Sequence, residues 1–482
     1  MENKNAVIVG GGPAGLATAL MLAKRGWNNI IVLEKRSSAS NYEIDKSYSY
    51  LIDGRGQKIL DYLELTDKLA RISVPSSEFY LTQIKPDGSR KTSKLPIIDP
   101  NKKTAYWLPR REFLNLLFQE IKENWQAQIT VLFNTKCIEI HQNETNLEII
   151  ASQEQNDNIL KFKPHFLVGC DGINSIIRQT LAQWDDSQSN RFEMKKFTSP
   201  SAGLKYKVLM LPSKFPLDSD KKELSESTKA YAIKGLKNNQ DLPLSLGILP
   251  VKNPEIPRNA NIIRRDNDKI WELKSDKAVL NFLEKTFPQL QIQEIISSEE
   301  AARFANSKGG HFPKPQHCSG FYFLLENNHG IVLLGDAIHS FPPDIGQGVN
   351  SALEDVLVLK ESLDTSNDED LYTALPLYEF NRYRDTEALI EIVRFAYPYQ
   401  YNQDPIAKKF WTINFILRLS LSKIIPFLIS PPAFFLIQNH QLSYKEILHK
   451  VQTTSRYLYL LGALSLLILC GFLLNLISFT PT

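Results

Sequence analysis

The feature that most constrains the fold is a strand, a glycine-rich turn and a helix at the start of the chain. Ala6 to Val9 are apolar and predict a strand, and Ala14 to about Lys24 predict a helix that ends at Gly26. A second apolar run, Ile30 to Leu33, predicts another strand and delivers Glu34 at its end. A strand, a helix and a strand in this order predict a βαβ unit of an α/β fold.

The turn inside this unit has the residues that a dinucleotide requires. Gly10, Gly12 and Gly15 have G-x-G-x-x-G spacing, and Glu34 lies 19 positions after Gly15. Glycines let the backbone approach a pyrophosphate, the helix N-terminus supplies amide donors, and the carboxylate accepts from a ribose hydroxyl. Because Glu34 would repel a 2′-phosphate, the site is predicted to bind the adenosine half of FAD or NAD. The residues assigned to it are Gly10, Gly12, Pro13, Ala14, Gly15, Glu34 and Lys35.

Length and charge narrow the class of protein. At 482 residues the chain is too long for a single core, which predicts two packed lobes with an appendage. Its formal net charge of +3 does not favour nucleic acid as a partner. The four cysteines are scattered without C-x-x-C spacing, so neither a disulfide framework nor a metal site is predicted.

The order of the expected elements predicts two interleaved domains. The nucleotide-binding domain is expected to be discontinuous, over residues 1–75, 105–190 and 316–395. An antiparallel-sheet substrate domain is expected over 76–104 and 191–315, because separated strands joined by lysine-rich loops occur there. The strands expected in its longer part are 204–211, 229–234 and 244–251. Residues 396–455 are expected to form C-terminal helices.

A second motif follows an apolar strand in the middle of the chain. Phe166 to Gly169 predict the strand, which runs into Asp171, and Ser175 and Arg178 follow at D-G-x-x-S-x-x-R spacing. This spacing predicts that the three polar side chains surround the start of a helix.

A third segment, nearer the C-terminus, also has an apolar strand that runs into an aspartate and is followed by the start of a helix. Ile331 to Leu334 predict a strand that ends in Gly335-Asp336, and a carboxylate there is suited to accept hydrogen bonds from two hydroxyls. Pro342-Pro343 predict a stiff wall with fixed φ. Residues 346–350 predict the start of a helix, whose N-terminus favours negative charge. His339 is interpreted as a structural residue.

Together these motifs resemble those of the class A flavoprotein monooxygenases, the aromatic-hydroxylase family, over most of residues 1–190 and 320–390. The resemblance implies a Rossmann-like FAD-binding domain of the p-hydroxybenzoate-hydroxylase type, with Asp336 on the ribityl chain and Asp171 and Arg178 beside FAD and the NADPH path. It implies a flavin face formed by Pro343, Gly346 and Gln347, with no acid or base assigned. The helix start that it places at the flavin is Gly346, Gly348, Val349 and Asn350.

Within this family the kynurenine 3-monooxygenase branch is the most similar. Residues 46–56 resemble its R-S-I-N-L-A-L-S-x-R-G segment, and Trp107 to Asn115 resemble its S-V-x-R-x-x-L-N segment. These matches imply that Lys46 and Arg111 bind FAD. Arg90 and Tyr106 are candidates, by residue type alone, for groups that hold a substrate carboxylate. Asp344 replaces a residue that is commonly apolar or small at this position.

The resemblance implies an enzyme that uses NADPH or NADH and O2. Reduced FAD would form a C4a-hydroperoxide, which inserts one oxygen atom into a small aromatic or lipophilic substrate and returns the other as water. Because the sequence has no second glycine fingerprint, the nicotinamide cofactor is expected to bind transiently. Two alternatives stay open: a membrane-bound FAD-dependent reductase of prenyl or polyene double bonds, and a non-catalytic flavin-binding membrane protein.

The C-terminus predicts a single-pass membrane anchor. Tyr457 to Phe479 are uncharged for 23 residues, and at about 1.5 Å per residue such a helix can cross a hydrocarbon layer of roughly 30 Å. Basic residues precede this span and no charged residue follows it, which favours a catalytic body on the cytosolic side. Residues 410–438 are apolar but interrupted by charges and prolines. For them, contact with the bilayer or the active site and packing against the soluble body are alternatives.

Overall fold

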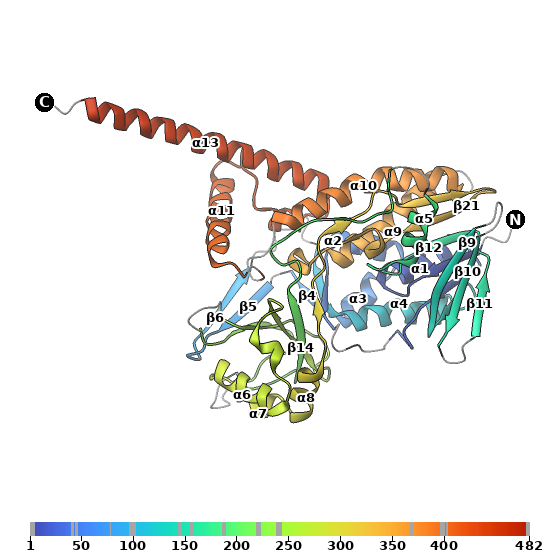
Figure 1. Ribbon diagram of the computed structural model, residues 1–482, viewed down its shortest axis with the longest axis horizontal. Coiled ribbons are helices and arrows are strands. Elements are labelled where there is room, and N and C mark those ends of the chain that lie inside the picture. Colours follow the sequence, from blue (N-terminus) through green and yellow to red (C-terminus); the bar gives the residue numbers. More distant parts are fainter. Residues whose placement is uncertain are drawn as a thin grey trace.

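A six-stranded sheet forms the centre of the computed structural model (Figure 1). The structure describes residues 5–39, 43, 47–77, 79–95, 103–142, 147–154, 158–185, 189–217, 223–237, 243–366, 370–395, 401 and 403–478. The strands of the sheet are β1 (Asn5–Val9), β2 (Asn29–Leu33), β8 (Ile129–Leu132), β12 (Phe166–Gly169), β20 (Tyr322–Leu325) and β21 (His329–Leu333). Their order is β20-β21-β12-β1-β2-β8, and every neighbouring pair is parallel except β20 with β21.

Helices cover this sheet because its central strands are apolar on both faces. Helix α1 is almost entirely apolar and buried, and it contacts both α4 and α9. The helices of this part are α1 (Pro13–Lys24), α2 (Gly54–Tyr62), α3 (Thr66–Ile72), α4 (Arg110–Asn124), α5 (Ile176–Trp184), α9 (Gly348–Thr365) and α10 (Leu371–Phe395). The predicted α/β architecture, with a largely parallel sheet covered by helices, is confirmed.

A second sheet of seven strands has its own core. Its strands are β5 (Phe79–Ile84), β6 (Arg90–Leu95), β14 (Lys205–Leu211), β15 (Ala230–Lys234), β16 (Ser245–Ile248), β17 (Arg258–Arg264) and β18 (Gly310–His311). Their order is β18-β14-β17-β16-β15-β5-β6, and the pair of β15 and β5 is parallel while the others are antiparallel. Two distant stretches of sequence therefore form one sheet.

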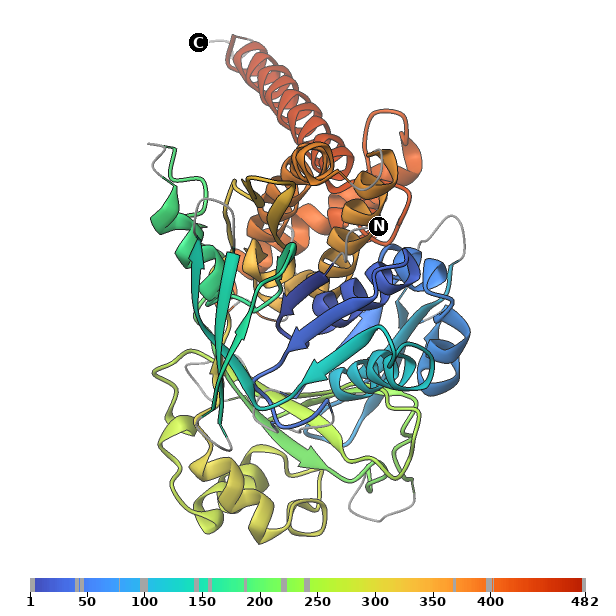
Figure 2. The ribbon, with the colours of Figure 1, turned by 90° about the vertical axis from the view of Figure 1, so that its right-hand side faces the viewer.

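The seven-stranded sheet also carries three helices that the sequence analysis did not anticipate. They are α6 (Asp276–Thr286), α7 (Ile292–Ile295) and α8 (Ser298–Asn306). Figures 1 and 2 show them on the outer side of the sheet, at the end of the molecule opposite the C-terminal helices. Buried residues such as Val279, Leu283 and Phe304 pack against the sheet, so this region is a mixed layer of strands and helices.

Three small sheets complete the body. Their strands are β3 (Ser49–Ile52), β4 (Val74–Ser76) and β7 (Ala105–Pro109); β9 (Thr135–Gln142), β10 (Leu147–Gln153) and β11 (Asn158–Phe162); and β13 (Lys195–Lys196), β19 (Gln316–His317) and β22 (His339–Ser340). In the third of these sheets β19 is the central strand, and it pairs with β13 on one side and with β22, which follows Asp336, on the other.

The C-terminal helices are α11 (Pro405–Ile424), α12 (Ala433–Leu436) and α13 (Tyr444–Ser478). Figures 1 and 2 show α13 extending away from the body, with its far end at the C-terminus. By length and composition, its stretch Tyr444–Gly471 could cross a membrane, and an 18-residue window within it has a mean hydropathy of 1.4. The helix begins 13 residues before the predicted Tyr457, because Tyr444 and Ile447 are buried in the body. Phe479 lies outside the described residues.

Candidate functional site

The residues assigned from sequence meet at one edge of the central sheet. Gly10 follows β1, Glu34 follows β2, Asp171 lies two residues after β12, and Asp336 follows the end of β21 closely. These four strands are adjacent and parallel, so their carboxyl ends lie side by side. In open α/β sheets this edge is where ligands bind. Three motifs that are far apart in the sequence therefore form one site.

The glycine turn is shaped both for packing and for access. Gly10 has φ +107°, and its amide donates to Leu33 O at 2.8 Å. A Cβ on Gly15 would lie 1.9 Å from Gly10 O, because α1 starts in close contact with the turn. A Cβ on Gly12 would meet no protein atom within 4 Å. Helix α1 also begins without a side-chain cap at Gly12, which leaves its first amides available to an anion.

This difference predicts separate effects for two matched substitutions. Gly12→Val is expected to fold normally but to purify with little or no FAD, because the side chain would occupy the space into which the turn opens. Gly15→Val is expected to lower the melting temperature, since its side chain would collide with the backbone of Gly10. Flavin absorbance per mole of protein and thermal unfolding of each variant measure the two effects. A Gly12→Val protein with full flavin content would contradict the assignment.

Glu34 is fixed at the end of β2 by a residue that the sequence analysis missed. It is 4% exposed and accepts hydrogen bonds from the Gly11 amide at 2.7 Å and from Arg36 Nε at 2.9 Å. Burial raises the pKa of Glu34, but hydrogen bonds and charge from Arg36 outweigh burial, so the pKa is lowered overall. Glu34 is therefore held as a carboxylate, which can accept hydrogen bonds from a ribose. Lys35 is exposed.

The D-G-x-x-S-x-x-R motif connects two parts of the site. Asp171 Oδ2 accepts from the Ile176 amide at 2.6 Å, and Ser175 caps α5 by accepting from the Arg178 amide at 3.0 Å. Arg178 is buried, and its Nη1 donates to Ala337 O at 2.9 Å. The motif thus holds the segment around Asp336, and Arg178 is occupied by backbone carbonyls.

Asp336 is exposed at the site, and Arg110, His339 and Asp355 act on it electrostatically. Surrounding protein raises its pKa, and His339 and Arg110 partly counter this effect. Arg110 also interacts electrostatically with Glu34, so its charge acts on both carboxylates. The sequence analysis selected Arg111 instead. Arg111 pairs with Glu112 at 3.2 Å and lines a small cavity against the seven-stranded sheet.

The segment after the two prolines has an open side and a closed side. Pro343, Gly346 and Gly348 are exposed, Gly346 has φ +65°, and a Cβ on either glycine would meet nothing within 4 Å. Helix α9 begins here with no side-chain cap and no acidic residue in its first turn. The uncapped N-terminus favours a ligand with partial negative charge.

The closed side is held by the remaining residues of the same segment, which are buried. Gln347 Nε2 donates to Asp53 Oδ2 at 2.8 Å, and Gln347 Oε1 accepts from Tyr444 Oη at 2.7 Å. Asn350 Nδ2 donates to Leu51 O at 2.9 Å. Gln347, Val349 and Asn350 therefore fix the segment from behind, while proline and glycine backbone faces the open space.

A buried ionic network supports this segment. Asp355 accepts from the Gly335 amide at 2.8 Å, His339 Nε2 at 2.8 Å and Arg382 Nε at 2.6 Å. Arg382 Nη1 lies 2.7 Å from Glu354, which also pairs with Arg55 at 2.9 Å. Burial raises the pKa of Asp355, but His339 and Arg382 outweigh burial and lower it overall. His339 is thus tied to a structural carboxylate.

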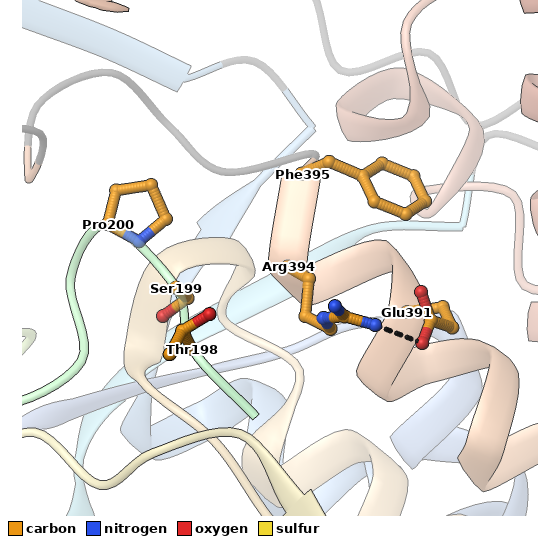
Figure 3. A pocket seen from close by; sticks show the side chains of 6 residues that line it. All are labelled: Thr198, Ser199, Pro200, Glu391, Arg394 and Phe395. Carbon is orange, nitrogen blue, oxygen red and sulfur yellow. Dashed lines mark hydrogen bonds and ion pairs between the residues drawn. The ribbon is translucent and has the colours of Figure 1, made fainter. Parts of the chain in front are cut away.

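Asp344 joins the segment 342–350 to the chain that enters the seven-stranded sheet. It is 2% exposed, and its Oδ2 accepts a hydrogen bond from Ser201 Oγ. Its Oδ1 has no hydrogen-bond partner in the described part of the chain. Burial raises the pKa of Asp344 from 3.8 to about 6. Next to Ser201, Thr198 to Pro200 and the end of α10 line a cavity of about 390 Å³. Figure 3 shows Arg394 and Glu391 joined on the α10 side of this cavity.

The raised pKa of Asp344 predicts a pH-dependent cost in stability. A carboxyl with a raised folded pKa binds more protons folded than unfolded, so stability falls as pH rises from about 4 to 6. A rise of about 2 in pKa corresponds to roughly 3 kcal/mol. Asp344→Asn is therefore expected to raise the melting temperature at pH 7.5 and to leave it nearly unchanged at pH 4.5. Equal shifts at both pH values would show that charge is not the cause.

Arg90 and Tyr106, two further candidates from sequence, do not join the site. Arg90 lies in β6 and forms an ion pair with Glu223. Tyr106 lies in β7 opposite Ile52 and packs against the main core. Lys46 lies outside the described residues.

Comparisons with known proteins agree with this geometry. Residues 3–204 match a family model described as FAD binding domain. The chain is 24% identical over 408 residues to kynurenine 3-monooxygenase of Dictyostelium discoideum, covering 81% of this chain and 79% of that protein. It is 25% identical over 403 residues to kynurenine 3-monooxygenase of Legionella pneumophila (strain Corby), covering 81% and 78%. Among solved structures, 2-methyl-3-hydroxypyridine-5-carboxylic acid oxygenase aligns with a TM-score of 0.58 at 17% identity, over 82% of this chain and 91% of that chain.

Proposed function

Because the chain belongs to the class A FAD-dependent monooxygenases of the aromatic-hydroxylase type, we propose that it uses NADPH or NADH and O2 to hydroxylate a small aromatic or lipophilic substrate. The observation that carries the proposal is the single edge where four parallel strands end, between the uncapped N-termini of α1 and α9. Kynurenine and related aromatic acids are the first substrates to examine, since the relatives above are kynurenine 3-monooxygenases.

The residues at this edge match the chemistry of FAD. Gly10, Gly12, Pro13, Ala14 and Gly15 would hold the pyrophosphate, and Glu34 the adenosine ribose. Asp336, with Arg110 nearby, would hold the ribityl chain. Pro343, Gly346 and Gly348 would face the flavin ring, and the dipole of α9 would favour negative charge there.

Bound FAD would supply the redox and oxygen chemistry. The chain's own residues would position the ring, because Gln347 and Asn350 anchor the segment that faces it. They would also exclude water, since unproductive loss of activated oxygen is otherwise fast. The role of Lys35, Lys46, Arg111, Asp171, Arg178 and Val349 beside the cofactor, as expected from sequence, is part of the proposal.

The proposal is tested by the reduction and turnover of purified holoprotein. Anaerobic mixing with NADPH or NADH is expected to bleach the flavin absorbance, faster when a substrate from an aromatic and lipid panel is present. In air the same substrate is expected to increase NADPH consumption. Turnover that continues at the same rate without O2 would favour the alternative reductase of prenyl or polyene double bonds. Absence of reduction with every donor would favour a non-catalytic flavin protein.

We further propose that α13 anchors the enzyme in a membrane, with the catalytic body on the cytosolic side. Its residues from Tyr459 to Leu469 are exposed, and Lys445, Lys450 and Arg456 precede them.

The anchor predicts a strong effect of charge within α13. Leu464→Arg combined with Leu467→Arg is expected to convert the protein from a form resistant to alkaline carbonate to an extractable form. Each arginine costs about 2.5 to 3.5 kcal/mol at the centre of a membrane helix. Phe380→Arg, at an exposed site on α10, is the control and is expected to stay membrane-bound. A wild-type protein that is itself extracted by carbonate would contradict the anchor.

A further inference from the structure

Helix α11 exposes most of its large aliphatic side chains and Phe410, and the residue that it buries is the charged Arg418. Ile406, Phe410, Ile413, Leu417 and Ile424 recur at intervals of three, four and seven residues, and all are exposed. Phe410 is 70% exposed and Ile424 73%. A helix on the surface of a soluble domain has the reverse arrangement, with its apolar stripe on the core. The exposed stripe therefore requires an apolar neighbour.

The opposite side of α11 is fixed against the other C-terminal helices. Arg418 is buried, and its Nη2 donates to Ser455 Oγ of α13 at 2.7 Å while its Nη1 donates to Val451 O at 3.3 Å. Phe415 lies between Trp411 and Phe435, with ring centroids 5.0 and 5.6 Å apart. These contacts hold the apolar stripe outward, so rotation of the helix would break them.

The contacts of Arg418 also show at which point along α13 the helix α11 packs against it. Ser455 lies two residues before Tyr457, and the exposed apolar run of α13 follows at once, with Tyr459 80% exposed. Figure 1 shows α11 at a steep angle to α13, on the side of the body. A helix that crosses α13 at this level lies along a membrane surface if α13 crosses the membrane. The apolar surface continues from α11 into Phe427 and Leu428, which are exposed as well.

The charge of this region matches an anionic lipid surface. From Pro405 to Thr482 the sequence has a single acidic residue, Glu446. Its basic residues are Lys408, Lys409, Arg418, Lys423, Lys445, Lys450 and Arg456. Lys409 and Lys423 are exposed beside the apolar stripe, which is the arrangement of helices that bind the interface of anionic bilayers.

We propose that α11 lies in the interfacial layer of an anionic bilayer, with its apolar stripe among the acyl chains, at the level where α13 enters the membrane. The inference rests on the proposed anchor and adds a second contact that fixes the orientation of the catalytic body. A second copy of the chain fits the surface less well. A helical partner would cover the stripe but would bring the flanking lysines of two copies together, and it would leave Phe427 and Leu428 exposed.

Nitroxide labels on the full-length holoprotein test the arrangement. Single cysteines at Ile413→Cys, Phe380→Cys and Leu467→Cys, in a Cys470→Ser background, are labelled in vesicles of phosphatidylcholine with phosphatidylglycerol. The Cys470→Ser protein without an added cysteine measures background labelling. We expect the label at 413 to be relaxed by lipid-soluble O2 and protected from a water-soluble nickel complex. The label at 380 is expected to behave in the opposite way. In vesicles of phosphatidylcholine alone, the label at 413 is expected to lose part of its protection.

The outcomes separate this inference from the anchor. One outcome is that the label at 467 is protected from the nickel complex while the labels at 413 and 380 are equally accessible to it. In that case the anchor stands and the inference about α11 fails. If neither label is protected, the anchor itself fails. Spin–spin coupling between labels at 413 on two copies would overturn the inference in favour of a dimer. Equal protection of the label at 413 with and without phosphatidylglycerol would overturn the proposal that α11 prefers anionic lipid.

Discussion

Purified Asp336→Ala protein is expected to be colourless, with its fold intact and at least about a tenfold weaker affinity for FAD. Asp336 is exposed at the carboxyl edge of the sheet, and within the part of the chain that the structure describes its side chain makes no hydrogen bond that holds the fold. Removal of a charged acceptor costs about 1.5 to 3 kcal/mol per hydrogen bond to the ligand, and each 1.4 kcal/mol is a factor of ten in affinity.

Flavin content and thermal unfolding together test this expectation. Asp364→Ala is a suitable control, since Asp364 is a partly exposed acid on α9 that pairs with Lys360 and Arg25. The control is expected to keep its flavin. If Asp336→Ala keeps the full yellow flavin content of wild type, Asp336 does not bind FAD as proposed. If Asp336→Ala loses its flavin and its melting temperature also falls, Asp336 has a structural role instead.

Arg382→Met is expected to destabilise the protein by about 3 to 5 kcal/mol, because it leaves buried carboxylates without their cation. Arg382 is 1% exposed and pairs with Glu354, Asp355 and Asp385. Asp355 in turn holds the Gly335 amide and His339, so the segment that carries Asp336 is expected to loosen as well.

Denaturant unfolding of the variant, followed by both protein and flavin fluorescence, measures this effect. Lys229→Met removes one member of an exposed ion pair with Glu226 and is the matched control, with an expected effect below about 1 kcal/mol. A similar stability for both variants would mean that the buried network contributes little. Arg382→Lys is expected to rescue only part of the loss, because lysine cannot reproduce the several hydrogen bonds of the guanidinium.

The local part of the site could be predicted from the sequence. A glycine turn between a strand and a helix is specified by neighbouring residues. Gly10 has a positive φ, Gly15 lies against the backbone of Gly10, and Gly12 lies beside open space. Strands β1, β2, β12 and β21 are short runs of buried apolar residues, so their positions and the edge at which they end follow from pattern alone.

The residues that the sequence did not reveal depend on contacts between distant segments. Arg110 was passed over for Arg111, because only the packing of α4 against neighbouring elements such as β7 decides which of two adjacent arginines acts on Asp336. The contact of Ser201 with Asp344 joins the segment 342–350 to the chain that enters the seven-stranded sheet, and no spacing encodes it. The contact of Tyr444 with Gln347 links α13 to the same segment.

Helices α6 and α8 were missed although the sequence held a signal for both. Ser275 and Ser297 cap their first turns, and Val279 and Leu283 lie four residues apart on the buried face of α6. Because strands were expected on either side, the whole segment 191–315 was predicted to consist of strands and loops. The caps, together with the spacing of these apolar residues, are the pattern that would have corrected it.

Incorporation of labelled oxygen tests the central claim most directly. The holoprotein is supplied with NADPH and ¹⁸O₂, with kynurenine first and then the wider aromatic and lipid panel, and products are analysed by mass. A FAD-dependent monooxygenase is expected to place one ¹⁸O atom in the hydroxylated product and to consume one NADPH for each. Hydroxylated product without the label, or reduced product formed equally well without O2, would contradict the account.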